Sequence, residues 1–367
     1  MEPLTLGIEE EYQIIDPETR ELTSFITEFL EQGAMVFRDQ MKPEFLQSQV
    51  EVGSNVCQNI KEAKFEIKRL RSMVHEVAQR NNRHFVAAGT HPFSRWEDQR
   101  VTNHERYHML LGNMRILAQR LLIFGMHVHV GIPDRNLQID IMNQMAYFMP
   151  HLLALSTSSP FWWGRNTGLK SYRSIIFEDL PRTGVPEQFD SAMEYDQYVD
   201  TLVRTGCIDE PTKIWWDIRP HPKFPTLEFR VCDCTTKVDE VIAITGMIQA
   251  LVAKMIQLRR RNQTWRLYRR TLLAENKFRS IKNGLDGSLI DFGKEREVPL
   301  RELMEEMLDF VDDVLDPLDS REEVEYIRVM LENGSSADRQ LAKFEETGDL
   351  KDVVDMLVEE TIEGCDT

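Results

Sequence analysis

Three consecutive glutamates interrupt an apolar segment near the N-terminus, GIEEEYQ at positions 7–13. In a β-strand alternate residues share a face, so Glu9 and Glu11 are expected to project together while Glu10 points the other way. Two neighbouring carboxylates repel each other unless one takes up a proton or a cation lies between them. Because oxygen ligands suit a hard cation, the pair indicates a magnesium or manganese site. A solvated edge strand is the alternative interpretation.

Two histidines occupy one face of a second apolar segment, GMHVHVG at positions 125–131. If this segment is a strand, His127 and His129 point to the same side. Metal binding, phosphate contact or substrate hydrogen bonding explains two such imidazoles better than core packing does. His-x-His is also a spacing found at zinc sites, so the pattern alone leaves a zinc hydrolase open.

A third segment, TLEFRV at positions 226–231, pairs an acid with a base. Glu228 and Arg230 would share a face, and Arg219 lies in the extended, proline-rich stretch before them. Phosphoryl transfer needs this combination, because the carboxylate holds a metal ion and the guanidinium binds phosphate oxygens. A structural salt bridge is the alternative for an isolated pair.

Two further segments add candidate residues. The stretch EFLQSQVE at positions 44–51 carries Glu51, while Glu44 either joins the same group or caps a turn. The loop at positions 159–173 is rich in glycine and aromatic residues, and its aromatic residues are expected to pack within the loop. Its basic residues could bind an anionic substrate. They are Arg165, Lys170 and Arg173.

The elements that would position these residues alternate between two hydrophobic periods. Strands are expected at 4–15, 44–52, 84–89, 123–131 and 226–231. Helices are expected at 59–79, 103–122, 137–155 and 238–261, and then at 301–315, 321–331 and 353–361. This order predicts an α+β fold, with a catalytic core at 1–298 and a helical C-terminal region at 299–367 packed on the same domain.

Composition restricts the partners. The chain carries 61 acidic and 44 basic residues, a net charge of -17, which disfavours nucleic acid and anionic membranes. No secretory signal and no uninterrupted run of 18 apolar residues is visible, so neither a membrane span nor export is expected. Five scattered cysteines fit a reduced, cytoplasmic protein.

Taken in order, the motifs resemble one family. GIEEEYQ, EFLQSQVE, AAGTHPFSRW, GMHVHVG and the stretch IWWDIRPHPKFPTLEFRVCD are similar to the glutamate–cysteine ligase type 2, or carboxylate-amine ligase, family. The resemblance spans nearly the whole chain. It implies a glutamine synthetase-like fold, in which a curved antiparallel sheet and its flanking helices form a funnel with nucleotide at one end and amino acid at the other.

The resemblance also implies roles for individual residues. It makes Arg219 and Arg230 the catalytic contacts of the transferred phosphoryl group. Contacts with ATP are expected from His129, Arg165, Lys170 and Arg173. The metal ligands that it implies, for Mg²⁺ or Mn²⁺, are Glu9, Glu11, Glu51, His127 and Glu228.

The resulting hypothesis is an ATP-dependent ligase that forms an amide through an acyl phosphate, with L-glutamate and L-cysteine as the family's usual substrates. Small molecules are thus the expected partners, and a homodimer is open. The alternatives are a guanidino kinase-like phosphotransferase, a zinc hydrolase built on the His-x-His strand, and a binding protein without activity.

Overall fold

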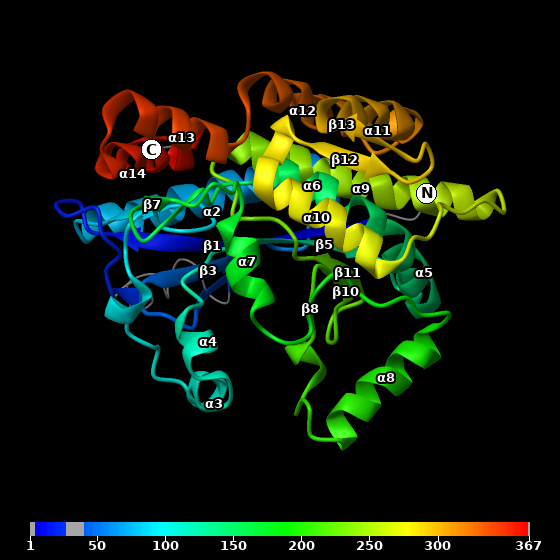
Figure 1. The fold of residues 1–367 in the computed structure, drawn as a ribbon, viewed down its shortest axis with the longest axis horizontal. Coiled ribbons are helices and arrows are strands. Elements are labelled where there is room, and N and C mark those ends of the chain that lie inside the picture. Colours follow the sequence, from blue (N-terminus) through cyan, green and yellow to red (C-terminus); the bar gives the residue numbers. More distant parts are fainter. Residues whose placement is uncertain (1–3, 27–39, 366–367) are drawn as a thin grey trace.

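A computed structural model describes residues 4–26 and 40–365, built around one antiparallel sheet (Figure 1). The sheet has seven strands in the order β10-β11-β5-β1-β3-β2, with β4 also paired to β1. The central position of β1 therefore places the GIEEEYQ segment between partners from three other parts of the chain. The strands are β1 (Leu6–Ile15), β2 (Met41–Pro43), β3 (Gln49–Gly53), β4 (His84–Val86), β5 (Met126–Gly131), β10 (Ile218–Pro220) and β11 (Thr226–Phe229).

Helices cover one face of the sheet. In Figure 1, α2 (Ile60–Arg80) and α9 (Val238–Arg260) lie above the strands, beneath a layer formed by the C-terminal helices. Asn59 caps the start of α2, because its side chain accepts a hydrogen bond from the Glu62 amide at 2.9 Å. The C-terminal helices are α11 (Leu300–Leu315), α12 (Arg321–Asn333), α13 (Ser336–Thr347) and α14 (Leu350–Ile362).

Helix α9 is the central core helix. By length and composition it is the one described helix that could cross a membrane, but 78% of its most apolar window is buried inside the molecule. It packs on α2, α11 and α12, and its buried residues belong to the same hydrophobic core as the apolar side of β1 and β5. Its apolar character is therefore explained by packing within the domain.

The remaining elements surround the sheet and its helical layer. In Figure 1, α3, α4 and α8 lie on the opposite side of the sheet from α9. Three small two-stranded pairs, β6–β7, β8–β9 and β12–β13, complete the fold. The bounds are α3 (Glu105–Met114), α4 (Ile116–Gln119), α5 (Arg135–Met145), α6 (Met149–Ser156), α7 (Tyr172–Glu178), α8 (Ala192–Arg204), α10 (Arg270–Asn283), β6 (Phe161–Trp162), β7 (Arg165–Asn166), β8 (Thr183–Gly184), β9 (Trp215–Trp216), β12 (Ser288–Asp291) and β13 (Arg296–Pro299).

Several expected elements are interrupted. The strand expected at 44–52 begins only at Gln49, because the backbone and side chain of Gln49 both bond to Leu46 and close a turn. The helix expected at 103–122 breaks at Arg115, whose φ of 51° lies outside the helical region. The helix expected at 137–155 divides where Pro150 cannot donate a backbone hydrogen bond.

The expected division of the chain falls inside a small element. The boundary between 298 and 299 lies within β13, and one hydrophobic core contains buried residues from both sides of it. Helix α14 packs on β4 and α2, so the C-terminal region reaches the central sheet. The division into a core and a C-terminal region therefore stays a prediction. Among the described residues, four α-helices were not revealed by the sequence patterns: α7, α8, α10 and α13.

Candidate active site

The three consecutive glutamates of β1 separate onto two faces of the sheet. Glu10 is fully buried on the helical side, where its carboxylate pairs with the Arg71 guanidinium of α2 at 2.5 Å. Glu9 and Glu11 face the other side, as strand alternation predicts. The cation that balances Glu10 is built into the fold, whereas Glu9 and Glu11 are available for a ligand.

Strand register brings the other candidates to the same face. Residue Glu9 is opposite His127, and Glu11 is opposite Glu51 across β3. On the next ladder His129 is opposite Glu228, which in turn is opposite Arg219. Residues more than 200 positions apart in the sequence are therefore neighbours because five strands lie side by side in the order β10-β11-β5-β1-β3.

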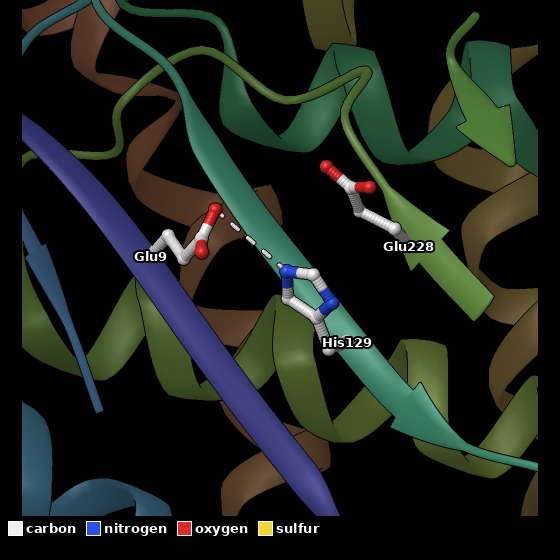
Figure 2. Close-up of side chains that lie close together, drawn as sticks. All are labelled: Glu9, His129 and Glu228. Atoms are coloured by element: carbon white, nitrogen blue, oxygen red, sulfur yellow. Dashed lines mark ion pairs between the residues drawn. The ribbon is translucent and has the colours of Figure 1, made fainter. Parts of the chain in front are cut away.

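Three of these residues form a compact cluster, which we call the phosphoryl-side cluster: Glu9, His129 and Glu228. One ligand atom from each lies within 4.8 Å of the others. Figure 2 shows the side chains projecting from three adjacent strands, with the His129 ring between the two carboxylates. The Nδ1 atom of His129 is 3.1 Å from the Thr226 hydroxyl, and its Nε2 atom is buried without a hydrogen bond, 3.7 Å from Glu9.

Two arginines fix Glu228. The Arg219 guanidinium donates to both Glu228 oxygens, at 2.8 and 3.2 Å, and is itself held by the backbone oxygens of Thr212 and Ile214. Arg230 also donates to Glu228. Burial raises the pKa of Glu228, but Arg230 and Arg219 outweigh it and hold this pKa well below its ordinary value. Glu228 is thus ionised at neutral pH.

Neighbouring side chains also shift the pKa of Glu9 and the pKa of His127, which lies next to the cluster. Burial raises the pKa of Glu9, but contacts with His127 and His129 outweigh it and leave the pKa well below its ordinary value. Burial and the nearby Arg230 lower the pKa of His127 to about 4. A neutral His127, 3.3 Å from Glu9 and 3.4 Å from Arg230, lies beside the cluster rather than in it.

A second group of carboxylates lies further along β1, and we call it the acidic cluster: Glu11, Glu44 and Glu51. Burial raises the pKa of Glu11 to about 7. The nearby Arg173 acts to lower this pKa, and the Glu51 charge acts to raise it. Burial and the other two carboxylates raise the pKa of Glu44 well above its ordinary value. Glu44 therefore joins the site rather than only capping a turn. Glu11 and Glu44 therefore tend to hold protons until a cation replaces them.

Arg173 lies behind the acidic cluster. It is 4% exposed, 3.8 Å from Asp233, and donates to the Arg230 and Val231 backbone oxygens. A side chain at Gly125 would overlap the Arg173 guanidinium, since a Cβ there would lie 2.4 Å from it. The Gly125 amide donates to Glu11 at 2.6 Å. Arg173 thus supports Glu11 and the end of β11 from within the protein.

The structure does not bring Arg165 and Lys170 to either cluster. The Lys170 ammonium pairs with Asp338 of α13, so it joins the loop to the C-terminal helices. Arg165 is exposed on β7. In the paired strand β6, Phe161 packs on Phe344 of α13. Their expected contact with ATP finds no support in these contacts.

Sequence reasoning missed the cavity next to the phosphoryl-side cluster. The cavity measures about 550 Å³ and lies where β1 and β11 begin and β3 and β5 end. Glu9 and His129 line one part of it, and Lys42 lines another. Its apolar wall includes Val56 and Phe224, which are 71% and 59% exposed. The pairing of β2 with β3 and the turn between β10 and β11 create this wall, and neither follows from a local pattern.

Comparisons with known proteins identify related sequences along the whole chain. The model of the glutamate-cysteine ligase family 2 matches residues 5–356. A protein of Chloroflexus aurantiacus named "Putative glutamate--cysteine ligase 2" is 59% identical over 360 residues, which cover 98% of this chain and 92% of that one. A protein of the same name from Roseiflexus sp. strain RS-1 is 57% identical over 99% of this chain and 96% of its own.

Solved structures share the fold at low sequence identity. The glutamate–cysteine ligase of Francisella tularensis, solved in complex with AMP, has a TM-score of 0.72 at 13% identity and covers 98% of this chain and 89% of its own. A bifunctional glutathione synthetase from Pasteurella multocida has a TM-score of 0.70 at 14% identity, over 98% of this chain and 52% of its own. The expected α+β fold, an antiparallel sheet with flanking helices, is confirmed and is shared with these two structures.

Proposed function

The chain belongs to glutamate–cysteine ligase family 2, and we propose that it is an ATP-dependent ligase that activates a carboxylate as an acyl phosphate and joins it to an amine. L-Glutamate and L-cysteine are the proposed substrates, since the relatives carry the name of that activity. A cytoplasmic location and a homodimer stay predictions.

The observation that carries this proposal is the meeting of Glu9, His129 and Glu228 beside two fixed arginines. A carboxylate is a poor electrophile because it is negatively charged, so it must be activated before an amine attacks it. Phosphoryl transfer gives that activation, and its catalysis depends on charge neutralisation and positioning. Metal ligands next to guanidinium groups meet both needs.

The cluster fits a divalent cation. Two ionised carboxylates face each other across an imidazole whose Nε2 is buried without a hydrogen bond, so a cation would complete the group. Mg²⁺ is the proposed ion, with Mn²⁺ as an alternative because it binds nitrogen more readily. When bound, the ion would neutralise phosphate oxygens. In the acidic cluster, Glu11 and Glu51 are proposed to hold a further ion.

The arginines act on the transferred group. The γ-phosphorus of ATP forms a bond to a carboxylate oxygen of the first substrate while its bond to the β-phosphate oxygen breaks, so ADP leaves. The guanidinium groups of Arg219 and Arg230 are held in place by Glu228 and are proposed to bind the phosphoryl oxygens during this step. The amine nitrogen then attacks the acyl carbon, phosphate departs, and the amine proton passes to solvent.

The cavity next to the cluster is the proposed site of the adenosine group. A volume of about 550 Å³ is within the range of small-molecule sites. The Phe224 ring stacks on His221 with centroids 4.7 Å apart and planes inclined by 13°, and it offers an exposed aromatic face to a base. The triphosphate would then run from this cavity toward Glu9 and Glu228.

The test is a product assay with ATP, Mg²⁺, L-glutamate and L-cysteine. The proposal predicts ADP, phosphate and a dipeptide of the corresponding mass in equal amounts, with no phosphate released when either amino acid is omitted. AMP with pyrophosphate would contradict the acyl-phosphate step. A phosphorylated amine would instead favour a kinase, and substrate hydrolysis without ATP would favour a zinc hydrolase.

A further inference from the structure

Lys42 occupies a position that no motif indicated. It lies on the short edge strand β2, directly opposite Glu51 of β3. Its ammonium group is 3.3 Å from a Glu51 oxygen, and its side chain is 56% exposed. Lys42 is also the one lysine or arginine among the described residues that line the 550 Å³ cavity, where Glu9 and His129 are the nearest site residues.

The pair with Glu51 does not by itself explain this lysine. An ion pair with one half-exposed partner adds little to stability. A lysine on an edge strand can also serve to discourage pairing with other chains. That role needs no particular direction for the ammonium, whereas here it lies between the acidic cluster and the cavity. The position therefore calls for a role in the site.

The charge balance of the site supplies that role. Five glutamates belong to the two clusters, and the two arginines nearest the phosphoryl-side cluster are both engaged with Glu228. A bound triphosphate would add several negative charges on the cavity side. If Glu51 binds a cation, Lys42 loses its partner, and its flexible four-carbon chain lets the ammonium turn toward the cavity.

We propose that Lys42 binds the phosphate groups of the nucleotide, and that it exchanges its Glu51 partner for them when a divalent cation occupies the acidic cluster. This inference rests on the proposed ligase function. It adds a third positive side chain to the two arginines, on the opposite side of the triphosphate, and it makes the edge strand β2 part of the nucleotide site.

The test compares Lys42→Met and Lys42→Arg with the wild type and with Lys64→Met. Lys64 is a matched control, because it forms an ion pair with Asp239 on the helical side of the molecule. Calorimetry would measure MgATP binding, and electron paramagnetic resonance would measure binding of Mn²⁺ alone. Loss of a charged hydrogen bond to phosphate is expected to weaken MgATP binding about 10- to 100-fold in Lys42→Met.

The Mn²⁺ titration separates a phosphate contact from a structural role. Removing the ammonium that competes for Glu51 should leave Mn²⁺ binding as tight as in the wild type or tighter, while a distorted site would bind both ligands more weakly. Lys42→Arg should recover most of the MgATP affinity. Parallel loss of both affinities, or MgATP binding by Lys42→Met within twofold of the wild type, would overturn the inference. A wild-type chain that binds no MgATP would overturn the ligase proposal with it.

Discussion

The phosphoryl-side cluster and the acidic cluster lie on one face of one sheet, yet the pKa values of their carboxyl groups are shifted in opposite directions. In the first, two arginines and two histidines keep Glu228 and Glu9 ionised despite burial. In the second, burial and mutual repulsion raise the pKa of Glu11 to about 7, and Glu44 and Glu51 follow in the same direction. Carboxylates of one residue type thus differ because Glu9 and Glu228 contact histidine or arginine directly, whereas Glu11 and Glu44 form no ion pair among the described residues.

The two clusters should therefore differ in how their cation binding depends on pH. A cation at the phosphoryl-side cluster displaces no proton from Glu9 or Glu228. It competes with a proton only at His129, where burial lowers the pKa but Glu9 and Glu228 outweigh it and raise it. A cation at the acidic cluster must displace protons, so its binding depends on pH in the physiological range.

Removing the charge of Glu228 should have the largest effect. The Glu228→Gln variant loses a proposed metal ligand and the group that positions Arg219 and Arg230, so its turnover should fall at least about 100- to 1000-fold. Glu240→Gln is the matched control, because Glu240 is a buried partner of Arg339 among the helices. Steady-state ADP release measures both. Full activity in a folded Glu228→Gln protein would remove the phosphoryl-side cluster from the mechanism.

The acidic cluster should make the metal-free protein less stable as pH rises. Glu11 holds its proton in the folded state up to about pH 7 but loses it near its ordinary pKa when unfolded. Its contribution is therefore fully present below the unfolded pKa and is lost as pH rises toward 7. For this shift the loss is roughly 3 kcal/mol.

Urea unfolding of the wild type and Glu11→Gln at pH 4.5, 6 and 8, with chelator present, measures this loss. The wild type should lose stability relative to Glu11→Gln over that range, and Mg²⁺ should restore part of it. A constant difference between the two proteins across pH would show that Glu11 does not hold a proton, and the contrast between the clusters would fail.

A smaller effect is expected at the cavity wall. Phe224→Ala removes the exposed ring that faces the proposed adenosine site, so KM for ATP should rise about 3- to 10-fold with little change in kcat. Phe65→Ala is the control, because Phe65 is 67% exposed on α2 and does not line the cavity. An unchanged KM in Phe224→Ala would move the base to another site.

The smallest effect is expected at Lys170. Its ammonium pairs with Asp338 of α13, so Lys170→Ala should lower thermal stability slightly and leave KM for ATP within about twofold of the wild type. Asp338→Ala should lower stability to a similar extent if the pair is structural. A large rise in KM for Lys170→Ala alone would restore its expected contact with the nucleotide.

Strand alternation made it possible to predict which side chains of the site share a face of the sheet. The separation of Glu9 from Glu10, the shared face of His127 and His129, and the pairing of Glu228 with an arginine all follow from a period of two. The relation between these strands required the resemblance to a family, since no local pattern fixes which strands pair. The proposal that His129, rather than His127, binds the cation rests on the register of β5 against β11, which places His129 opposite Glu228.

Other features depend on contacts between distant segments. Lys42 lies beside Glu51 because β2 pairs with β3. Lys170 lies away from both clusters and pairs with Asp338 of α13. Helix α13 itself was missed, so the partner of Lys170 was not available to sequence reasoning. The break in the helix at Arg115 likewise coincides with a positive φ, which an arginine in the sequence does not predict.

If Glu9, His129 and Glu228 together bind one cation that holds the triphosphate, anomalous diffraction from crystals grown with Mn²⁺ and a non-hydrolysable ATP analogue should show it. We expect a manganese peak bonded to all three side chains, with the analogue's phosphates between that peak and the two arginines and its base against Phe224. Manganese and nucleotide bound elsewhere, with these three residues free of both, would contradict this expectation.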